Sequence, residues 1–354
     1  MITHNLGNLF GGVTFAALVV GAASAETVFI PEGSADSMLI VDAATGTTIR
    51  RIEGLEAVHG LSGAPGVPVL VAGSYTEIER TKITEIEQPI GVSADDHAAH
   101  HAAAPKRLGP ADAGLSLLSI LDATSGEILR QIEVPGAVHH TAVSPNGRFA
   151  IATHPSGDGI SVVDLVDFEL VAFVVTGSMP NYAVFGADPD IVYVTNTGNG
   201  TISEVDLTRG IVRRNLIAGE APEHMVADPD AGVLYVADAD VGQVLELDLT
   251  DETARRSFDI GGEIHGLGLS DDRTRLFVAG RGENKLAAID LDSGSVTTVA
   301  LTPEPYHLTT IPGTGRFFVS SRAEPMVWIV EDINLSVTGE FPVNGEGHQM
   351  VATQ

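Results

Sequence analysis

The sequence contains no cysteine and few basic residues. Without cysteine no disulfide can stabilise the fold, and a metal ion would have to be held by imidazole and carboxylate groups instead of thiolates. The 19 lysine and arginine residues stand against 47 aspartate and glutamate residues, which gives a formal net charge of −28. Such a surface repels phosphate backbones and anionic lipid headgroups and attracts cations. The composition therefore argues against nucleic-acid partners and against stable association with a membrane.

The N-terminal apolar run is short. Residues 9–20 are largely apolar, and an Ala-Ser-Ala cleavage signature ends at Ala25. The run is too short to span a bilayer comfortably, and the pattern is typical of a secretory signal, although no lysine or arginine precedes it. We expect residues 1–25 to be a cleaved signal peptide and residues 26–354 to be the exported protein. A buried N-terminal strand or a retained anchor is the alternative.

A repeat of about 42 residues runs through the rest of the chain. Its marker is usually histidine and recurs after 41 or 42 residues, with one longer interval of 81 residues at the start. The marked positions are His59, His140, Tyr182, His224, His265, His307 and His348. An aspartate series runs in phase with them: Asp42, Asp122, Asp164, Asp206, Asp248 and Asp290. A fixed period of this length indicates one supersecondary unit stacked on its neighbours.

Residues 180–221 show what one unit contains. Turn residues separate four short β-rich segments, at 182–185, 191–194, 201–207 and 211–217. The third segment alternates in polarity as a half-buried strand does, and no helical period is present. Four short strands per unit are typical of one blade of a β-propeller.

The number of units predicts an all-β fold, a seven-bladed β-propeller that forms a single domain over residues 26–354. Six units are complete and the seventh is split between the chain ends. Residues 26–57 hold three of its strands, and residues 348–353 supply the first. Joining the C-terminal strand to the N-terminal blade would close the ring and leave no free sheet edge between the first and last blades.

One unit, residues 58–137, is about 38 residues too long for the repeat. The excess is a polar, acidic insert at about residues 76–114, and it contains His97, His100 and His101. A loop of this length within compact repeats is usually functional or disordered. We expect these three histidines to capture metal, with a disordered linker rich in alanine and histidine as the alternative.

The topology of a propeller predicts where the marker histidines lie. The first strand of each blade lines the central channel, and its start lies at the same end of the ring as the loop between the second and third strands. One channel mouth should therefore collect the insert and the six marker histidines, His59, His140, His224, His265, His307 and His348. Neutral imidazole is the commonest metal ligand, and zinc takes three or four nitrogen or oxygen ligands.

We predict about one tightly bound metal ion, held by a subset of these six histidines. The sequence leaves open which subset binds and whether the ion is zinc or copper(II), which binds such sites more tightly. A purely structural role for the six is the alternative. His139 should face the opposite side of the strand from His140 and serve packing. We expect His154 to be a turn residue, the aspartate series to cap turns, and Trp328 to lie in the core.

The segment Tyr193-Val194-Thr195-Asn196 resembles the motif of the YVTN-type, YncE-like periplasmic propellers, over nearly all of residues 26–354. With the export signal, the mouth histidines and the histidine-rich insert, the chain is similar to the AztD family of periplasmic zinc metallochaperones. That resemblance implies a periplasmic protein that carries zinc as cargo, without turnover. It implies delivery to the zinc-binding solute-binding protein of an ABC importer. We expect a monomer without enzymatic activity.

Three other interpretations remain open. A YncE-like propeller could serve protein interaction with no metal at all. A propeller lactonase is a second possibility, although no persuasive acid–base set with arginine support stands out. Nitrous-oxide reductase also mounts histidines on a seven-bladed propeller, but it carries a second copper domain with cysteines, which this chain lacks.

Overall fold

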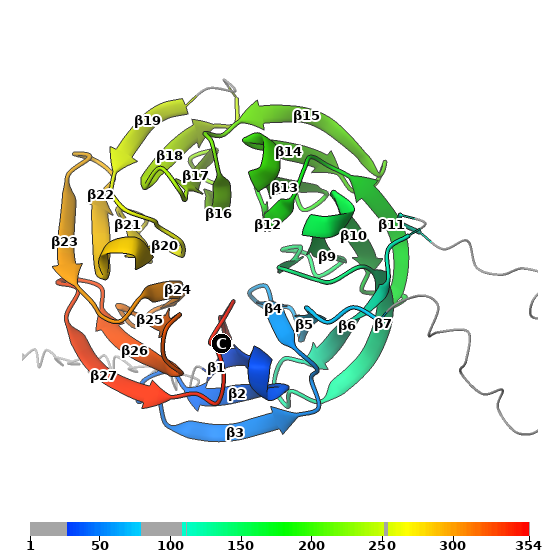
Figure 1. The fold of residues 1–354 in the computed structure, drawn as a ribbon, viewed down its shortest axis with the longest axis horizontal. Coiled ribbons are helices and arrows are strands. Elements are labelled where there is room, and N and C mark those ends of the chain that lie inside the picture. The colour runs from blue at the N-terminus through cyan, green and yellow to red at the C-terminus, as the bar shows by residue number, and fades with distance from the viewer. Residues whose placement is uncertain (1–26, 79–107, 111, 251–253, 354) are drawn as a thin grey trace, which may run out of the picture.

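The computed structural model describes residues 27–78, 108–110, 112–250 and 254–353. These residues form seven four-stranded antiparallel sheets arranged in a ring around a common axis (Figure 1). The innermost strand of each sheet faces the axis, and the outermost strand forms the rim. The predicted seven-bladed β-propeller is confirmed.

The four strands of each blade follow one another from the axis to the rim. The split blade contains, in this order, β28 (Val351–Thr353), β1 (Thr27–Glu32), β2 (Ser37–Asp42) and β3 (Thr48–Glu53). The next contains β4 (Val58–Ser62), β5 (Val69–Ser74), β6 (Leu115–Asp122) and β7 (Ile128–Pro135). The third contains β8 (Thr141–Val143), β9 (Phe149–His154), β10 (Gly159–Asp164) and β11 (Glu169–Val175). The fourth contains β12 (Pro180–Phe185), β13 (Ile191–Asn196), β14 (Thr201–Asp206) and β15 (Ile211–Ile217).

The last three blades follow the same order. The fifth contains β16 (Pro222–Asp228), β17 (Val233–Asp238), β18 (Gln243–Asp248) and β19 (Ala254–Asp259). The sixth contains β20 (Leu267–Leu269), β21 (Arg275–Gly280), β22 (Lys285–Asp290) and β23 (Val296–Ala300). The seventh contains β24 (Pro305–Ile311), β25 (Arg316–Ser321), β26 (Met326–Glu331) and β27 (Val337–Pro342).

The two ends of the chain close the ring as predicted. β28 pairs with β1, with Val351 opposite Phe29 and Thr353 opposite Thr27. The hydroxyls of Thr27 and Thr353 are also hydrogen-bonded, at 3.0 Å. The strand begins at Val351 instead of at His348, so the histidine lies in the segment that enters the blade.

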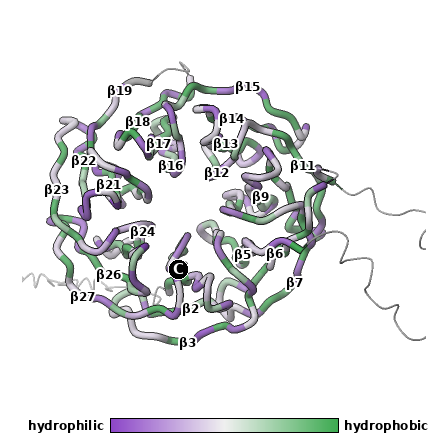
Figure 2. The backbone as a smooth tube through the Cα atoms, viewed as in Figure 1, coloured by the Kyte–Doolittle hydropathy of each residue, from purple (hydrophilic) through white to green (hydrophobic). Residues whose placement is uncertain are grey.

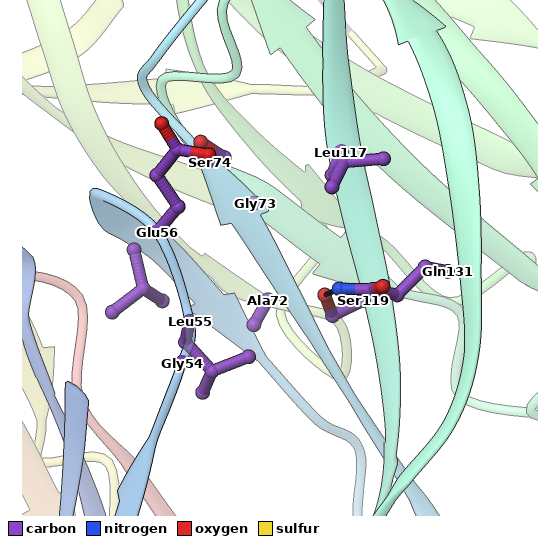
Figure 3. Close-up of a pocket in the computed structure, with 10 residues that line it drawn as sticks. Gly54, Leu55, Glu56, Ala72, Gly73, Ser74, Leu117, Ser119 and Gln131 are labelled. Carbon is purple, nitrogen blue, oxygen red and sulfur yellow. Dashed lines mark hydrogen bonds between the residues drawn. The ribbon is translucent and has the colours of Figure 1, made fainter. Parts of the chain in front are cut away.

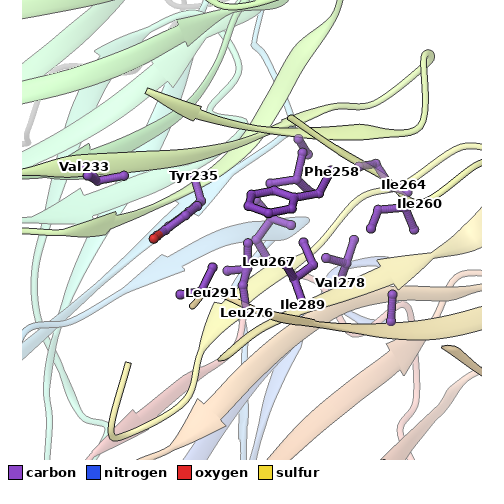
Figure 4. Packing of buried hydrophobic residues seen from close by; sticks show 13 residues of the cluster. Val233, Tyr235, Phe258, Ile260, Ile264, Leu267, Leu276, Val278, Ile289 and Leu291 are labelled. Carbon is purple, nitrogen blue, oxygen red and sulfur yellow. The ribbon is translucent and has the colours of Figure 1, made fainter. Parts of the chain in front are cut away.

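Hydrophobic side chains fill the space between neighbouring blades. The middle strand β13 is buried along its whole length, whereas the rim strand β15 alternates between exposed and partly buried positions. Hydrophobic and hydrophilic positions accordingly alternate along the rim in Figure 2. One interblade cluster joins Tyr235 and Phe258 of the fifth blade to Leu267 and Leu276 of the sixth (Figure 4). Trp328 is 3% exposed and belongs to another such cluster, as predicted.

The aspartate series caps the turns that follow the third strand in six of the seven blades. The carboxylate of Asp42 accepts hydrogen bonds from the backbone N–H groups of Ala44 and Thr45. The same arrangement, with one or two such bonds, recurs at Asp122, Asp164, Asp206, Asp248 and Asp290. Carboxylates that bond to the backbone two or three residues ahead stabilise a turn, so the prediction for this series is confirmed.

Short 3₁₀ helices connect the second and third strands of four blades. They are η1 (Gly33–Ala35), η2 (Pro155–Gly157), η3 (Thr197–Asn199) and η4 (Arg281–Glu283). Each is followed by a residue in the left-handed region: Asp36, Asp158, Gly200 and Asn284. Glycine, asparagine and aspartate tolerate this conformation best, which explains why these positions carry them.

Candidate metal centre

The marker positions lie where the inner strands begin or are irregular. In β4, β12, β16 and β24 the pairing with the next strand shifts register at the marker, which is His59, Tyr182, His224 or His307. Such bulges redirect a side chain away from the regular alternation of a strand. In β8, β20 and β28 the marker histidine instead precedes the first strand residue. Both arrangements free the side chain to turn toward the axis.

Two glycines allow neighbouring inner strands to approach each other closely. A Cβ atom on Gly60 would lie 2.9 Å from the backbone of His140. One on Gly266 would lie 2.7 Å from the backbone oxygen of Tyr306 and from the backbone nitrogen of Leu308. Only glycine fits where backbones come this close. The glycines directly follow the markers His59 and His265.

The structure brings all six marker histidines together, and His139 joins them. Their ring centroids are separated by 3.3 Å for His59 and His348, 3.9 Å for His307 and His348, and 4.4 Å for His224 and His307. His139 lies 4.3 Å from His140 and 4.7 Å from His59. We call these seven residues the mouth cluster: His59, His139, His140, His224, His265, His307 and His348.

The mouth cluster contains three sets of three ligand atoms close enough to hold one ion. Within each set the atoms lie within 4.8 Å of one another. The outer triad is His59, His139 and His348. The middle triad is His265, His307 and His348. The inner triad is His140, His224 and His307.

Close contacts of Nδ1 with an oxygen atom orient three of the imidazole rings. The Nδ1 atom of His140 lies 2.9 Å from the backbone oxygen of Asn181, and that of His59 lies 2.8 Å from the backbone oxygen of His139. The Nδ1 atom of His265 lies 2.9 Å from a carboxylate oxygen of Glu223. Each oxygen can only accept, so Nδ1 carries the proton and Nε2 keeps its lone pair. Ligating histidines are usually oriented in this way.

Five ring nitrogens of the mouth cluster are buried without a hydrogen-bond partner in the described part of the chain. They are His139 Nδ1, His140 Nε2, His224 Nε2, His265 Nε2 and His348 Nδ1. An unsatisfied buried polar atom costs about 1–3 kcal/mol, and such atoms are rare in native structures. A metal ion would satisfy several of them at once.

Burial keeps the mouth cluster neutral. It lowers the pKa of His59 from 6.5 to about 4 and that of His139 to about 3. Burial, reinforced by the neighbouring histidines, also holds the pKa well below 6.5 for the other five, His140, His224, His265, His307 and His348. Metal ions bind the neutral ring, so protons do not compete with metal for these rings at neutral pH.

Aromatic side chains and one glutamine surround the histidines. Tyr306 stacks on His265 at a centroid distance of 4.0 Å. Tyr182, which replaces histidine in one blade, lies 4.6 Å from His140. Burial raises the pKa of Tyr182 to about 12, so its hydroxyl keeps its proton and is a poor metal ligand. The Gln349 side chain accepts hydrogen bonds from the N–H groups of Leu61 and Thr141, and so ties the C-terminal segment to two other blades.

The prediction for His139 is wrong. Its ring lies beside that of His140 instead of on the opposite side, because β8 begins only at Thr141 and alternation does not apply before it. His154 has both nitrogens satisfied, by the backbone oxygen of Ala137 at 3.0 Å and by the hydroxyl of Ser161 at 2.8 Å. It ends β9 as a structural residue, as predicted.

Two parts of the sequence-based prediction lie outside the described residues. They are the signal peptide at residues 1–25 and the insert histidines His97, His100 and His101. Within the described ranges, no helix has the length and the apolar character needed to cross a bilayer.

A separate surface pocket does not contribute to this site. It has a volume of about 230 Å³ and lies between the connection from β3 to β4 and the strands β5 and β6. Figure 3 shows Glu56, Ser74 and Gln131 among the residues that line it. Its lining contains a single carboxylate and no histidine, so the unpaired ring nitrogens remain the chemical feature that calls for a ligand.

Comparison with known proteins supports the fold. No protein-family model and no curated protein matches the sequence. Among solved structures, the chain is similar to hydrazine synthase of Kuenenia stuttgartiensis, with a TM-score of 0.67, 14% identity, and coverage of 87% of this chain and 93% of that chain. It is also similar to the periplasmic gluconolactonase PpgL of Pseudomonas aeruginosa, with a TM-score of 0.69, 15% identity, and coverage of 94% and 99%. The shared feature is the fold.

Proposed function

We propose that this protein is an exported zinc-binding chaperone that acts as a monomer in the periplasm. It would deliver its ion to the solute-binding protein of a zinc ABC importer. The observation that carries the proposal is the set of buried, neutral ring nitrogens without hydrogen-bond partners in the mouth cluster. Three or four imidazoles form a suitable shell for zinc. The acidic surface would favour the approach of the cation.

A carrier suits this site better than an enzyme does. Catalytic zinc sites keep one coordination position open for water or substrate. In the mouth cluster the histidines of the inner triad, His140, His224 and His307, are at most 3% exposed. The rings of Tyr182 and His265 pack directly against them. Such crowding favours retention of an ion over the turnover of a substrate.

The metal content and zinc affinity of protein purified without an affinity tag test binding. The parent should contain about one zinc ion, because the triads overlap and share ligands. Replacing His224, His265 and His307 together by alanine should abolish tight binding. The matched control is His154→Asn, which alters a buried histidine outside the mouth cluster and should leave binding intact. Zinc affinity that is unchanged in the triple variant would remove these histidines from the site.

The transfer of zinc tests delivery. Zinc-loaded protein is mixed with the zinc-free solute-binding protein or with a small chelator of similar affinity, and transfer is followed by stopped flow. Delivery predicts faster transfer to the protein acceptor than spontaneous dissociation allows. Equal rates for the two acceptors would contradict a chaperone. Zinc-dependent hydrolysis of a lactone by the parent, lost in the triple variant, would favour an enzyme instead.

A further inference from the structure

The three triads of the mouth cluster are linked through shared residues. His348 belongs to both the outer and the middle triad, and His307 belongs to both the middle and the inner triad. The Nε2 atoms of these two residues lie 3.0 Å apart. Two nitrogens bound to the same tetrahedral zinc ion lie about 3.3 Å apart, given bonds of about 2.0–2.1 Å. The two Nε2 atoms are hydrogen-bonded to each other, so one of them carries a proton that must move to Nδ1 before both can hold one ion.

The triads also differ in depth. His59 and His139 of the outer triad are only partly buried, whereas His348 and every residue of the other two triads are at most 5% exposed. Tyr75, which stacks on His59 at 4.8 Å, is 50% exposed. An ion that arrives from solvent therefore meets the outer triad before the others.

Simultaneous occupation of the outer and inner triads is unfavourable. These two triads share no residue, but their rings are in direct contact, with centroids of His139 and His140 at 4.3 Å and of His307 and His348 at 3.9 Å. Two dications this close repel strongly in a buried site. Among the described residues, the only carboxylate paired with the cluster is that of Glu223. One ion with several alternative positions fits this arrangement better than two ions do.

We infer that the mouth cluster is a path along which a single zinc ion moves between three overlapping sites. The ion binds first to the outer triad. It passes to the middle triad while His348 stays bound, and then to the inner triad while His307 stays bound. Release follows the same path in reverse. At each step the ion keeps at least one imidazole and exchanges the others, so it is never returned to water inside the protein. This inference rests on the proposed function.

The two partly buried residues of the outer triad provide the test. In the double variant His59→Gln/His139→Gln the middle and inner triads remain, but the ion must reach them without the outer one. We expect the association and dissociation rate constants of zinc to fall together, each by about tenfold or more. Affinity should change far less than either rate, whereas ordinary loss of a ligand acts mainly on dissociation. The probes are zinc chloride for association and a small chelator for dissociation, both by stopped flow.

Two further variants keep the test decisive. His224→Gln removes a ligand of the inner triad only, and it should weaken affinity by about tenfold through faster dissociation. His154→Asn lies outside the mouth cluster and should leave both rates at the parent values. Thermal melting of each variant establishes that it is folded, and the single variants His59→Gln and His139→Gln replace the double variant if it is not.

The outcomes separate the two proposals. A parent protein that binds no zinc would overturn the proposed function and this inference with it. If the parent binds zinc but the double variant loses affinity through faster dissociation alone, the outer triad is the storage site and the path is wrong. Rates that are unchanged in the double variant, or two tight zinc ions in the parent, would likewise overturn the path while leaving zinc binding intact.

Discussion

At the residue scale, the second nitrogen of each imidazole separates the candidate ligands from the structural histidines. His140 and His154 are both completely buried, and burial lowers the pKa of both. His154 has a hydrogen-bond partner on each ring nitrogen, whereas Nε2 of His140 has none. Burial alone therefore does not identify a ligand, but a buried lone pair without a partner does point to one.

The structural role of His154 predicts a specific dependence of stability on pH. Burial lowers its pKa in the folded protein to about 4, from a usual value of 6.5. Between these values the unfolded chain binds the proton and the folded protein does not, so the free energy of unfolding falls as pH drops from about 6.5 to about 4. One such group contributes a slope of at most about 1.4 kcal/mol per pH unit.

His154→Asn should reduce the slope of the unfolding free energy against pH by up to about 1.4 kcal/mol per pH unit. Asn196 occupies the equivalent position of the next blade, where its side chain donates hydrogen bonds to Thr201 and Ser203. Asparagine is therefore compatible with the end of the second strand of a blade. The measurement is denaturant unfolding of metal-free parent and variant between pH 4 and 7. Parallel curves for the two proteins would show that His154 does not titrate as its burial implies.

Glu223 should act on the metal through His265. A carboxylate oxygen of Glu223 lies 2.9 Å from Nδ1 of His265, and this contact fixes the ring and makes Nε2 a better ligand. We expect Glu223→Ala to weaken zinc affinity by about 10- to 100-fold, and Glu223→Gln to weaken it less because the amide oxygen still accepts the proton. Glu263→Gln is the control, since Glu263 pairs with Arg281 at the surface. If the parent and Glu223→Ala had equal zinc affinities in a competition assay with a chelator, this role would be ruled out.

The sequence predicted six residues of the mouth cluster and missed the partners that orient them. The six recur with the blade period, so their common position follows from topology alone. His139 was missed because alternation was assumed before the strand had begun. Glu223 and Gln349 do not recur with the blade period. Glu223 makes its contact in one blade only, and Gln349 reaches from the C-terminal segment to another blade.

At the element scale, local departures from regular strands create the site. The register shift between Pro222 and Met225 frees His224, and the one between Pro305 and Leu308 frees His307. The positions of the strands could be predicted from the sequence because aspartate, glycine and asparagine indicate the turns between them. It could not locate the bulges, because they depend on how the second strand pairs with the first.

Closure of the ring by β28 is testable without disturbing the metal ligands. Truncation after Met350 removes the strand but keeps His348 and Gln349. The loss of the β28 pairing with β1 should lower the free energy of unfolding by about 2–3 kcal/mol, and the exposed edge of β1 should promote self-association. Thermal melting and size-exclusion chromatography measure both effects.

The matched control for the truncation is Thr353→Ala. It removes only the hydroxyl contact with Thr27 and should have a much smaller effect. A truncated protein that melts with the parent and stays monomeric would contradict closure of the ring by this strand.

At the scale of the whole molecule, the ring gathers ligands that are far apart in the chain. His59 and His348 are separated by almost the whole sequence, yet their ring centroids lie 3.3 Å apart because the split blade closes the circle. No local motif encodes such a site. The period of the repeat was sufficient to predict the fold and the convergence of the markers, whereas the identity of the ion depends on chemistry that the fold does not determine.

The most direct test of the central claim is X-ray absorption at the zinc edge, on protein without an affinity tag loaded with one equivalent of zinc. The mouth cluster predicts a shell of three or four nitrogen or oxygen atoms at about 2.0–2.1 Å. Scattering beyond this shell should come from at least three imidazole rings. A shell with one imidazole or none would contradict zinc binding by the mouth cluster.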